Sequence, residues 1–258
     1  MNSNHKPNVI GIIPARLESA RLPRKPVLDI FGKSLVQRVW EQSSKASVFS
    51  NTYIATDSHE IKELAEQFGA NVIMTSPTHP SGTDRIAEAV QKLFLNIDEL
   101  DLVVNIQGDI PFINPKIIDL IVKDHLNADE SFDLATLATP MTEEEFSNPK
   151  NVKVVCSLTG KALYFSRSLI PFARDEVSQQ AFKHIGLYSY RPKSLLKITS
   201  LKPSPLERTE RLEQLRALEN NMSIKVLTVE REDLEPGVEV DTQEDLEKAI
   251  EIARSLNL

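Results

Sequence analysis

The sequence has one cysteine and no long apolar run. Cys156 alone cannot build a disulfide framework, and most cysteine-based zinc sites need several thiolates. It lies in the alternating run 152–158, which favours a buried strand thiol over a catalytic nucleophile. The longest early apolar run, residues 9–13, ends at Pro14 and is too short for a signal peptide or a membrane span. We therefore expect a cytoplasmic protein that does not enter membranes.

An excess of positive charge is also absent. Thirty Lys and Arg against thirty-seven Asp and Glu give a net charge of −7, which argues against a general binder of nucleic acid or anionic membranes. The glycine-rich dinucleotide fingerprint and the P-loop motif are both missing. With 258 residues, 41% of them hydrophobic, the chain can bury a core without disulfides or metal.

Short apolar runs alternate with helical patterns along the chain. The pattern predicts strands at 9–13, 52–56, 72–75, 102–106, 134–138, 152–156, 162–165, 186–190 and 224–229. It predicts helices at 35–40, 59–68, 82–94, 116–126, 205–220 and 243–256. Such alternation indicates one Rossmann-like domain over residues 1–258, a three-layer α/β/α fold with a mostly parallel mixed sheet. A small β-rich insertion at about 140–190 is the candidate dimer contact.

The loop 14–26 follows the first predicted strand, where ligands bind in open α/β sheets. It holds three prolines and the cations Arg16, Arg21, Arg24 and Lys25. Guanidinium forks bind phosphate oxygens bidentately, so the loop suits a polyphosphate. A solvated basic loop paired with surface acids explains the same residues.

Acidic residues give two further candidate sites. Asp109 and Asp241 each follow a predicted strand, and Mg²⁺ is commonly held by one or two carboxylates plus substrate phosphates. The alternatives are a turn residue for Asp109 and a helix N-terminal charge for Asp241. On the predicted helix 205–220, four acceptors fall within about 120° of one face. These are Glu207, Glu210, Glu213 and Gln214, and they either hold sugar hydroxyls or form a solvated acidic face.

Seven blocks carry a resemblance to a known family. The loop resembles the Arg-x-x-Ser-x-Arg-Leu-Pro-Gly-Lys-Pro signature of bacterial sugar-acid cytidylyltransferases. Further blocks follow in the same order at 81–85, 105–111, 162–171, 184–188, 212–216 and 240–242. Within that group, the chain is most similar to the 3-deoxy-manno-octulosonate cytidylyltransferase (CMP-Kdo synthetase) family.

This resemblance implies a nucleotidyltransferase with the corresponding fold. A hydroxyl of a 3-deoxy-2-keto sugar acid would attack the α-phosphorus of CTP and release pyrophosphate, with Mg²⁺, in a homodimer that serves lipopolysaccharide biosynthesis. Such chemistry needs positioning and charge neutralisation more than a covalent nucleophile. The same reaction on the 8-amino analogue or another acid sugar is one alternative, and a non-catalytic nucleotide-binding protein is another.

The resemblance also assigns residues to roles. The residues assigned to CTP binding are Pro14, Ala15, Arg16, Arg21, Lys25, Ser81, Gly82 and Arg85. The sugar acid is assigned to Gln107, Arg167, His184, Tyr188, Glu213 and Gln214. The residues assigned to Mg²⁺ are Asp109 and Asp241. The residues assigned to catalysis are Arg16, Lys25 and Asp109. No general base stands out: His184 is a candidate, and activation by the metal is the simpler hypothesis.

From the residues alone, purely structural roles explain several of the same side chains. Ser81 fits a helix cap, His184 a structural histidine and Tyr188 a core residue. Three positions depart from the family pattern. Arg24 replaces a glycine in the loop, Ile110 replaces a glutamate, and Ser189 replaces a glycine. The last two lie beside the sugar blocks and leave the sugar open, whereas Arg24 bears on the conformation of the loop.

Overall fold

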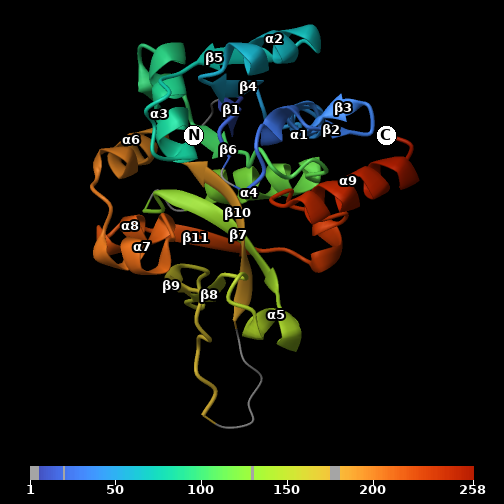
Figure 1. Cartoon of the computed structure of the whole chain (residues 1–258). Helices are drawn as coiled ribbons and strands as arrows, with labels where there is room; N and C mark the ends of the chain where they lie inside the picture. The colour runs from blue at the N-terminus through green and yellow to red at the C-terminus, as the bar shows by residue number, and fades with distance from the viewer. Residues whose placement is uncertain (1–5, 20, 129–130, 175–180) are drawn as a thin grey trace. The chain divides into compact units, whose positions relative to one another are not determined.

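The computed structural model describes residues 6–19, 21–128, 131–174 and 181–258 (Figure 1). The chain divides into two compact units. Unit 1 is Met1–Asp119 with Leu234–Leu258, and unit 2 is Leu120–Asp233. Within the described ranges, no helix has both the length and the apolarity needed to cross a bilayer. The prediction of a single domain with an insertion stays a prediction.

A parallel sheet forms the centre of unit 1, in the order β6-β1-β4-β5. Its strands are β1 (Val9–Ala15), β4 (Asn51–Thr56), β5 (Asn71–Met74) and β6 (Leu102–Asn105). Ile10, Ile12 and Val103 are almost completely buried. Strands covered on both faces carry continuous apolar runs, and that is why the sequence predicted β1 and β6 most clearly.

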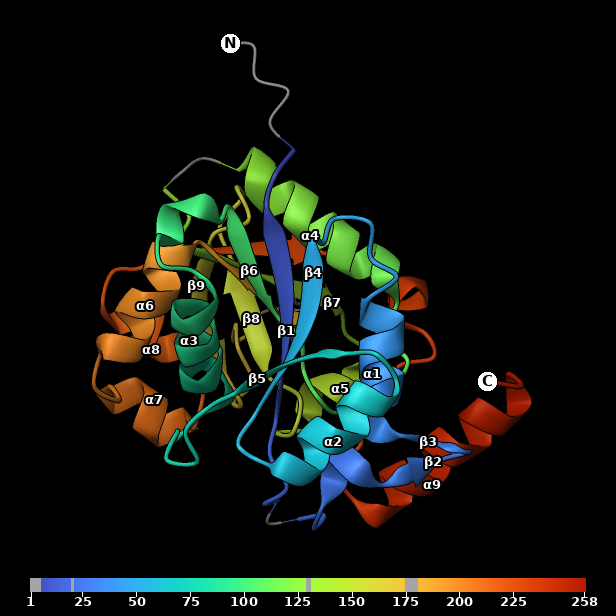
Figure 2. The same ribbon diagram turned by 90° about the horizontal axis from the view of Figure 1, so that it is seen from above.

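Helices cover both faces of this sheet. They are α1 (Leu35–Ser43), α2 (His59–Gln67) and α3 (Gly82–Leu93), while α4 (Pro115–Asn127) runs on into unit 2. The last helix of the unit, α9 (Gln243–Ser255), packs against residues 29–30 instead. The chain passes outward from β1 to β4 and β5, then returns to β6 on the other side of β1. Because crossovers are right-handed, the return places α3 on the face opposite α1, as Figure 2 shows.

Shorter elements complete unit 1. They are η1 (Lys25–Val27), β2 (Asp29–Ile30), β3 (Lys33–Ser34) and η2 (Ile97–Glu99). Side-chain caps fix where its helices begin. Ser81 accepts the N–H of Asp84 at 3.2 Å, and Thr242 accepts the N–H of Asp245 at 3.3 Å. The cap at Ser81 was predicted from the sequence, because short hydroxyl side chains satisfy the unpaired N–H groups of a first turn.

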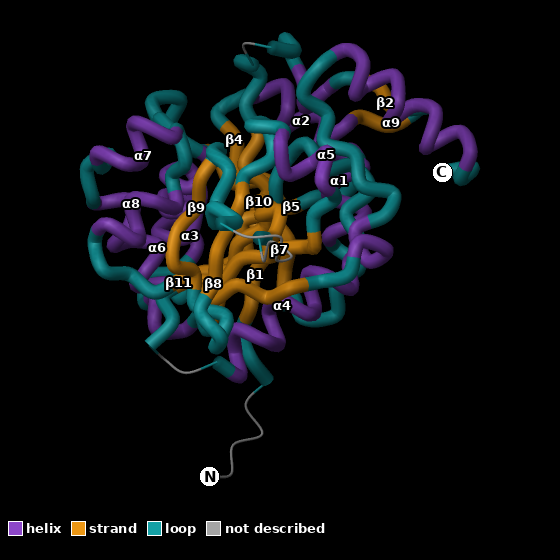
Figure 3. Tube along the Cα trace, turned by 90° about the horizontal axis from the view of Figure 1, so that it is seen from below, coloured by secondary structure: helices purple, strands orange, loops and turns teal. Residues whose placement is uncertain are grey.

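Unit 2 has a mixed sheet, in which β7 pairs parallel with β11 and antiparallel with β10. β8 pairs antiparallel with both β10 and β9. The strands are β7 (Leu134–Pro140), β8 (Lys153–Cys156), β9 (Ala162–Ser166), β10 (Phe182–Tyr190) and β11 (Ile224–Thr228). The helices are α5 (Glu143–Ser147), α6 (Pro192–Ser200), α7 (Pro205–Glu210) and α8 (Gln214–Glu219), and η3 (Arg231–Leu234) ends the unit. Figure 3 shows α6, α7 and α8 grouped beside β9 and β11.

The prediction of one helix over 205–220 is wrong. Arg211 adopts φ 55° and ψ 48°, a left-handed conformation that ends α7, and α8 begins three residues later. A contact across this break fixes it: the Arg216 guanidinium donates to both carboxylate oxygens of Glu207, at 2.5 and 2.8 Å. The common acidic face expected on a continuous helix therefore does not form.

Cys156 lies on β8 and is half-buried. Burial raises the pKa of its thiol to about 11. The thiolate is the nucleophilic form, so Cys156 is unreactive at neutral pH, as the sequence pattern predicted.

Glu145 gives unit 2 a testable pH dependence. Arg231 and Lys183 pair with it, and the Arg231 hydrogen bond above all lowers its pKa from 4.5 to about 2. Its stabilisation is therefore complete above pH 4.5 and is lost as the pH falls through 2. We expect Glu145→Gln to lower the free energy of unfolding by about 1–2 kcal/mol at pH 7 and by less than half of that at pH 3.

Urea unfolding at the two pH values measures this difference. The exposed neighbour Glu144 supplies the control, and Glu144→Gln should change stability by less than about 0.5 kcal/mol at both. An equal loss for Glu145→Gln at pH 7 and pH 3 contradicts the ionic role.

Candidate functional site

A cavity of about 410 Å³ opens in unit 1 at the carboxyl ends of β1 and β6. The chain reverses its direction across the sheet between these strands, and open α/β sheets bind ligands at such a point. Four segments line the cavity: the end of β1 with the loop after it, residues 79–85 around the start of α3, the residues after β6, and Asp241 before α9. Every residue that the family resemblance assigned to CTP is among the lining residues.

Two glycines allow these segments to approach one another. A Cβ on Gly108 would lie 2.9 Å from the carbonyl oxygen of Pro14, and a Cβ on Gly82 would lie 3.1 Å from the Pro14 ring. The first distance is shorter than real Cβ contacts, and the atom it meets belongs to the backbone. Gly108 therefore permits the close packing of the chain after β6 against the end of β1.

Lys25 is the centre of the site. Its Nζ donates to Asp109 Oδ2 at 2.9 Å and to Asp241 Oδ1 at 3.0 Å, with 16% of its side chain exposed. Burial lowers the pKa of Lys25, but the two carboxylates outweigh it, so the pKa is raised above 10.5. Arg21 adds a second cation, 2.9 Å from Asp241 Oδ2. The fold thus brings the two predicted aspartates to one ammonium group.

The carboxylate pair suits a divalent metal. Asp109 and Asp241 offer oxygen ligands on one cavity wall, and the Val240 N–H binds the Asp109 carbonyl at 2.8 Å, which joins their backbones. Among the described residues, no group of three or more His, Cys, Asp and Glu side chains forms a metal cage. Two carboxylates fit Mg²⁺, because it takes its remaining ligands from water and substrate phosphates.

The other cations of the loop differ in where they point. Arg16 is exposed and lines the cavity, whereas Arg24 pairs with Glu60 of α2 and does not line it. Arg24 adopts φ 59° and ψ 25°, the left-handed region that favours glycine. The loop therefore keeps the backbone conformation that the family's glycine suits, and the departure affects the contact with α2.

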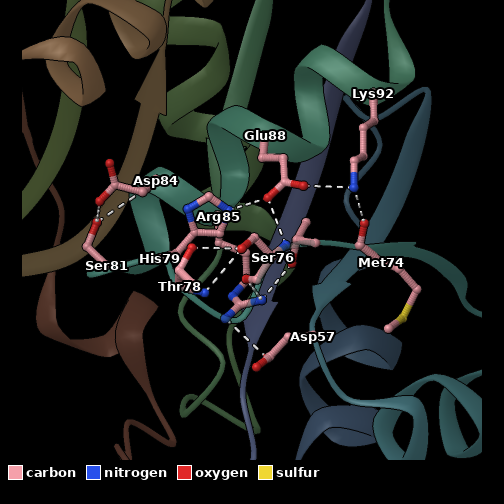
Figure 4. A network of polar contacts seen from close by, with 11 residues as sticks. Asp57, Met74, Ser76, Thr78, His79, Ser81, Asp84, Arg85, Glu88 and Lys92 are labelled. Atoms are coloured by element: carbon pink, nitrogen blue, oxygen red, sulfur yellow. Dashed lines mark hydrogen bonds and ion pairs between the residues drawn. The ribbon is translucent and has the colours of Figure 1, made fainter.

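Arg85 is only 3% exposed and is held by protein groups (Figure 4). Its Nη1 donates to Thr75 Oγ1 at 2.6 Å, and its Nη2 lies 3.1 Å from Asp57 Oδ1. Burial lowers the pKa of its guanidinium. Arg85 thus fixes the ends of β4 and β5 against α3 and reaches the cavity only as part of its wall.

Sequence reasoning missed His79, which lines the cavity and contacts Glu88 of α3 through Nε2. It also missed Lys153, which is fully buried on β8. Lys153 Nζ donates to three backbone carbonyls, including that of Arg167 at 3.0 Å. Two signals in the sequence pointed to these residues. Glu88 lies on the same helical face as Arg85, and Lys153 lies within an apolar strand.

Of the residues assigned to the sugar, Gln107 lines the cavity of unit 1, and the other five belong to unit 2. The His184 and Tyr188 rings lie 5.4 Å apart. His184 Nε2 is 3.0 Å from Thr136 Oγ1, and burial lowers the pKa of His184 to about 3. Burial, followed by Tyr190 and Glu213, raises the pKa of Tyr188 well above 10. Both side chains are therefore neutral at physiological pH.

Gln214 and Arg167 differ in how far the protein satisfies them. Gln214 is 6% exposed, and its Nε2 is a buried donor without a partner among the described residues. Arg167 Nε donates to the Glu210 carbonyl at 3.0 Å, and its backbone N–H donates to the Glu210 carboxylate at 3.0 Å. Glu210 is thus occupied in holding Arg167 and does not belong to an acidic sugar-binding face.

Comparison with known proteins gives a consistent family. A family model described as Cytidylyltransferase matches residues 10–224. A 3-deoxy-manno-octulosonate cytidylyltransferase 1 from Actinobacillus pleuropneumoniae serotype 5b is 44% identical over 93% of this chain and 97% of its own length. A 3-deoxy-manno-octulosonate cytidylyltransferase from Polynucleobacter necessarius is 45% identical over 99% of this chain and 100% of its own length.

Solved structures agree. CMP:2-keto-3-deoxy-manno-octonic acid synthetase complexed with CTP superposes with a TM-score of 0.88 at 36% identity, covering 97% of this chain and 100% of that one. A 4-diphosphocytidyl-2C-methyl-D-erythritol synthase from Anaerococcus prevotii shares the fold, with a TM-score of 0.62 at 15% identity over 96% of this chain and 97% of that one. The predicted fold class, a three-layer α/β arrangement with a mostly parallel mixed sheet, is confirmed.

The Lys25 cluster makes a prediction about stability. Lys25→Met removes the cation that two partly buried carboxylates share and leaves only the exposed Arg21 beside Asp241, so we expect the free energy of unfolding to fall by about 1–3 kcal/mol at pH 7. Adding Asp241→Asn should recover most of this loss, since it removes one of the two like charges. Urea denaturation of the single and double variants measures both effects.

Lys33→Met is the matched control, because it removes a surface ion pair with Glu41 and should cost less than about 1 kcal/mol. Failure of Asp241→Asn to restore stability contradicts the assignment of the loss to carboxylate repulsion.

Proposed function

Because this chain belongs to the cytidylyltransferase family, we propose that it transfers the cytidylyl group of CTP to 3-deoxy-manno-octulosonate and releases pyrophosphate. Its relatives with this name match it over nearly their whole length. The observation that carries the proposal is the Lys25–Asp109–Asp241 cluster in a cavity edged by Arg16 and Arg21. The product is an activated sugar acid of the kind consumed in lipopolysaccharide synthesis.

The cationic loop binds and orients the triphosphate. Arg16, Arg21 and Lys25 line the cavity, and their charges complement the phosphate oxygens. The anomeric hydroxyl oxygen of the sugar forms a bond to the α-phosphorus, the bond from the α-phosphorus to the bridging oxygen breaks, and the hydroxyl proton passes to solvent. Lys25 and Arg16 stabilise the charge that develops on the leaving pyrophosphate.

We also propose Mg²⁺ as the cofactor. Asp109 and Asp241 would hold it, together with oxygens of the nucleotide. When bound, it neutralises phosphate charge and increases the acidity of a coordinated oxygen. Lys25, which contacts both carboxylates, neutralises them before the nucleotide binds.

Unit 2 carries most of the candidate groups for the sugar acid. The buried Gln214 amide is a donor that lacks a protein partner, which suits a hydroxyl acceptor on the sugar. Arg167 is the candidate for its carboxylate, because a guanidinium fork matches the anion. An imidazole with a pKa of about 3 is a weak proton acceptor, so His184 serves in binding and not as general base.

One departure from the family pattern has a structural explanation that does not involve the sugar. Ser189 is fully buried, and its Oγ lies 2.7 Å from His125 Nδ1, so the hydroxyl serves the core of unit 2. Ile110 is half-buried, and nothing in the structure explains its replacement of glutamate. The 8-amino analogue stays the second candidate substrate.

A coupled pyrophosphate assay tests the reaction. With CTP and Mg²⁺, we expect pyrophosphate release with 3-deoxy-manno-octulosonate, and a lower kcat/KM with its 8-amino analogue. Asp109→Asn should lower turnover at least about a hundredfold, while the free energy of unfolding changes by less than about 1 kcal/mol. Lys33→Met, outside the cavity, should retain turnover.

The proposed reaction is overturned if no 3-deoxy-2-keto sugar acid gives pyrophosphate release. If calorimetry then shows that CTP binds, a non-catalytic nucleotide-binding protein is favoured. If folded Asp109→Asn retains full activity, the residue is structural.

We further propose a homodimer, located in the cytoplasm. Unit 2 exposes apolar side chains in the predicted insertion: 60% of Leu163, 55% of Leu169 and 88% of Phe172. Large exposed apolar groups so close in sequence are typical of an interface. Light scattering should give twice the mass of the chain, and Phe172→Ser should shift the mass toward the monomer. A monomeric wild-type protein contradicts this proposal.

A further inference from the structure

Charged side chains on one face of α3 bind the connection between β5 and α3. This connection forms part of the cavity wall. Arg85, Glu88 and Lys92 follow one another at helical spacing and bind this connection in turn (Figure 4). Lys92 Nζ donates to the Met74 carbonyl at 2.8 Å. His79, at the cavity end of the connection, lines the site.

Glu88 is the central residue of these contacts. Its Oε2 accepts the Ser76 N–H at 2.8 Å and contacts His79 Nε2, and its Oε1 lies 2.7 Å from Lys92 Nζ. Burial opposes ionisation of Glu88, but the hydrogen bonds from Lys92, Ser76 and His79 lower its pKa to about 2. The carboxylate is therefore ionised at working pH and only accepts hydrogen bonds.

An ionised carboxylate at Nε2 determines the form of the His79 ring. Towards an ionised carboxylate, Nε2 can only donate a proton. In the Nε2–H tautomer the other ring nitrogen, Nδ1, is an acceptor. Ionised phosphates have acceptors only and cannot pair with such a nitrogen. The nucleoside part of CTP does carry donors, namely the cytosine amino group and the ribose hydroxyls.

We propose that Glu88 is a positioning residue that acts through His79. It fixes the ring and its tautomer in the cavity wall, so that Nδ1 accepts a hydrogen bond from an N–H or O–H donor of the nucleoside. This inference rests on the proposed function, since CTP is taken as the ligand. It adds to the cationic loop, which faces the phosphates, a hydrogen-bond acceptor for the other end of the same molecule.

A double-mutant cycle tests the coupling. Glu88→Gln keeps the shape of the side chain and removes its charge, and His79→Ala removes the ring. Each should raise the KM for CTP about tenfold, the equivalent of one lost hydrogen bond, with kcat and the KM for the sugar acid within twofold of wild type. The double variant should be no worse than His79→Ala alone.

Lys92→Met is the matched control, because it removes another partner of Glu88 outside the cavity and should leave the KM for CTP unchanged. An equal effect of Glu88→Gln with and without the His79 ring overturns the proposal, because Glu88 then acts on the loop alone. An increase of the same size in Lys92→Met overturns it for the same reason.

Nitrogen-15 NMR of the His79 side chain reads the tautomer directly. The proposal expects the Nε2–H form in wild type, and a ring protonated at Nδ1, alone or in addition, overturns it.

Calorimetry with CTP, UTP, 2′-deoxy-CTP and 3′-deoxy-CTP identifies the donor, because the matching analogue loses affinity in wild type and not in His79→Ala. If no analogue behaves in this way, His79 does not contact the nucleoside.

These binding measurements need no turnover. They separate failure of the His79–Glu88 pair from failure of the proposed reaction, which the pyrophosphate assay of the wild-type protein reports.

Discussion

The contact of one ammonium group with two carboxylates organises the functional part of unit 1. Lys25 belongs to the loop after the first strand, Asp109 lies 84 residues further along the chain, and Asp241 lies 216 residues further. Neither aspartate is near the other in sequence, and like charges in a partly buried cavity repel. A cation between them makes the arrangement stable without a ligand, and the same cation is the one that we propose to bind phosphate.

The sheet supplies the frame for this contact. Because β6 returns to the far side of β1, the ends of two neighbouring strands open toward the loop that carries Lys25. Gly108 permits the backbone after β6 to lie against Pro14. On the opposite wall, α3 holds the connection that carries His79 through charged groups on one of its faces. Close backbone packing and buried charge therefore hold both of these parts of the cavity in place.

Much of this frame could be predicted from sequence, because strands buried on both faces need continuous apolar runs and helices need local caps. What failed was set by contacts between distant residues. Arg211 ends α7 in a left-handed conformation, and no glycine marks the break; the Glu207–Arg216 pair that accompanies it forms only after the chain has turned. The His79–Glu88 pair was invisible for the same reason, since a loop residue and a helix residue meet only once α3 has docked. The ligating roles of Asp109 and Asp241 came from family resemblance, and geometry supplied their proximity.

Because the Lys25 cluster is partly enclosed, it also bears on the response to ionic strength. Exposed pairs such as Lys248–Glu244 weaken once the Debye length shrinks to about 10 Å or less. The carboxylates that contact Lys25 are 27% and 30% exposed, so mobile ions screen them far less. We therefore expect the shape of the resting cavity to depend little on salt, whereas the proposed phosphate contacts of the exposed Arg16 and Arg21 should weaken as salt is added.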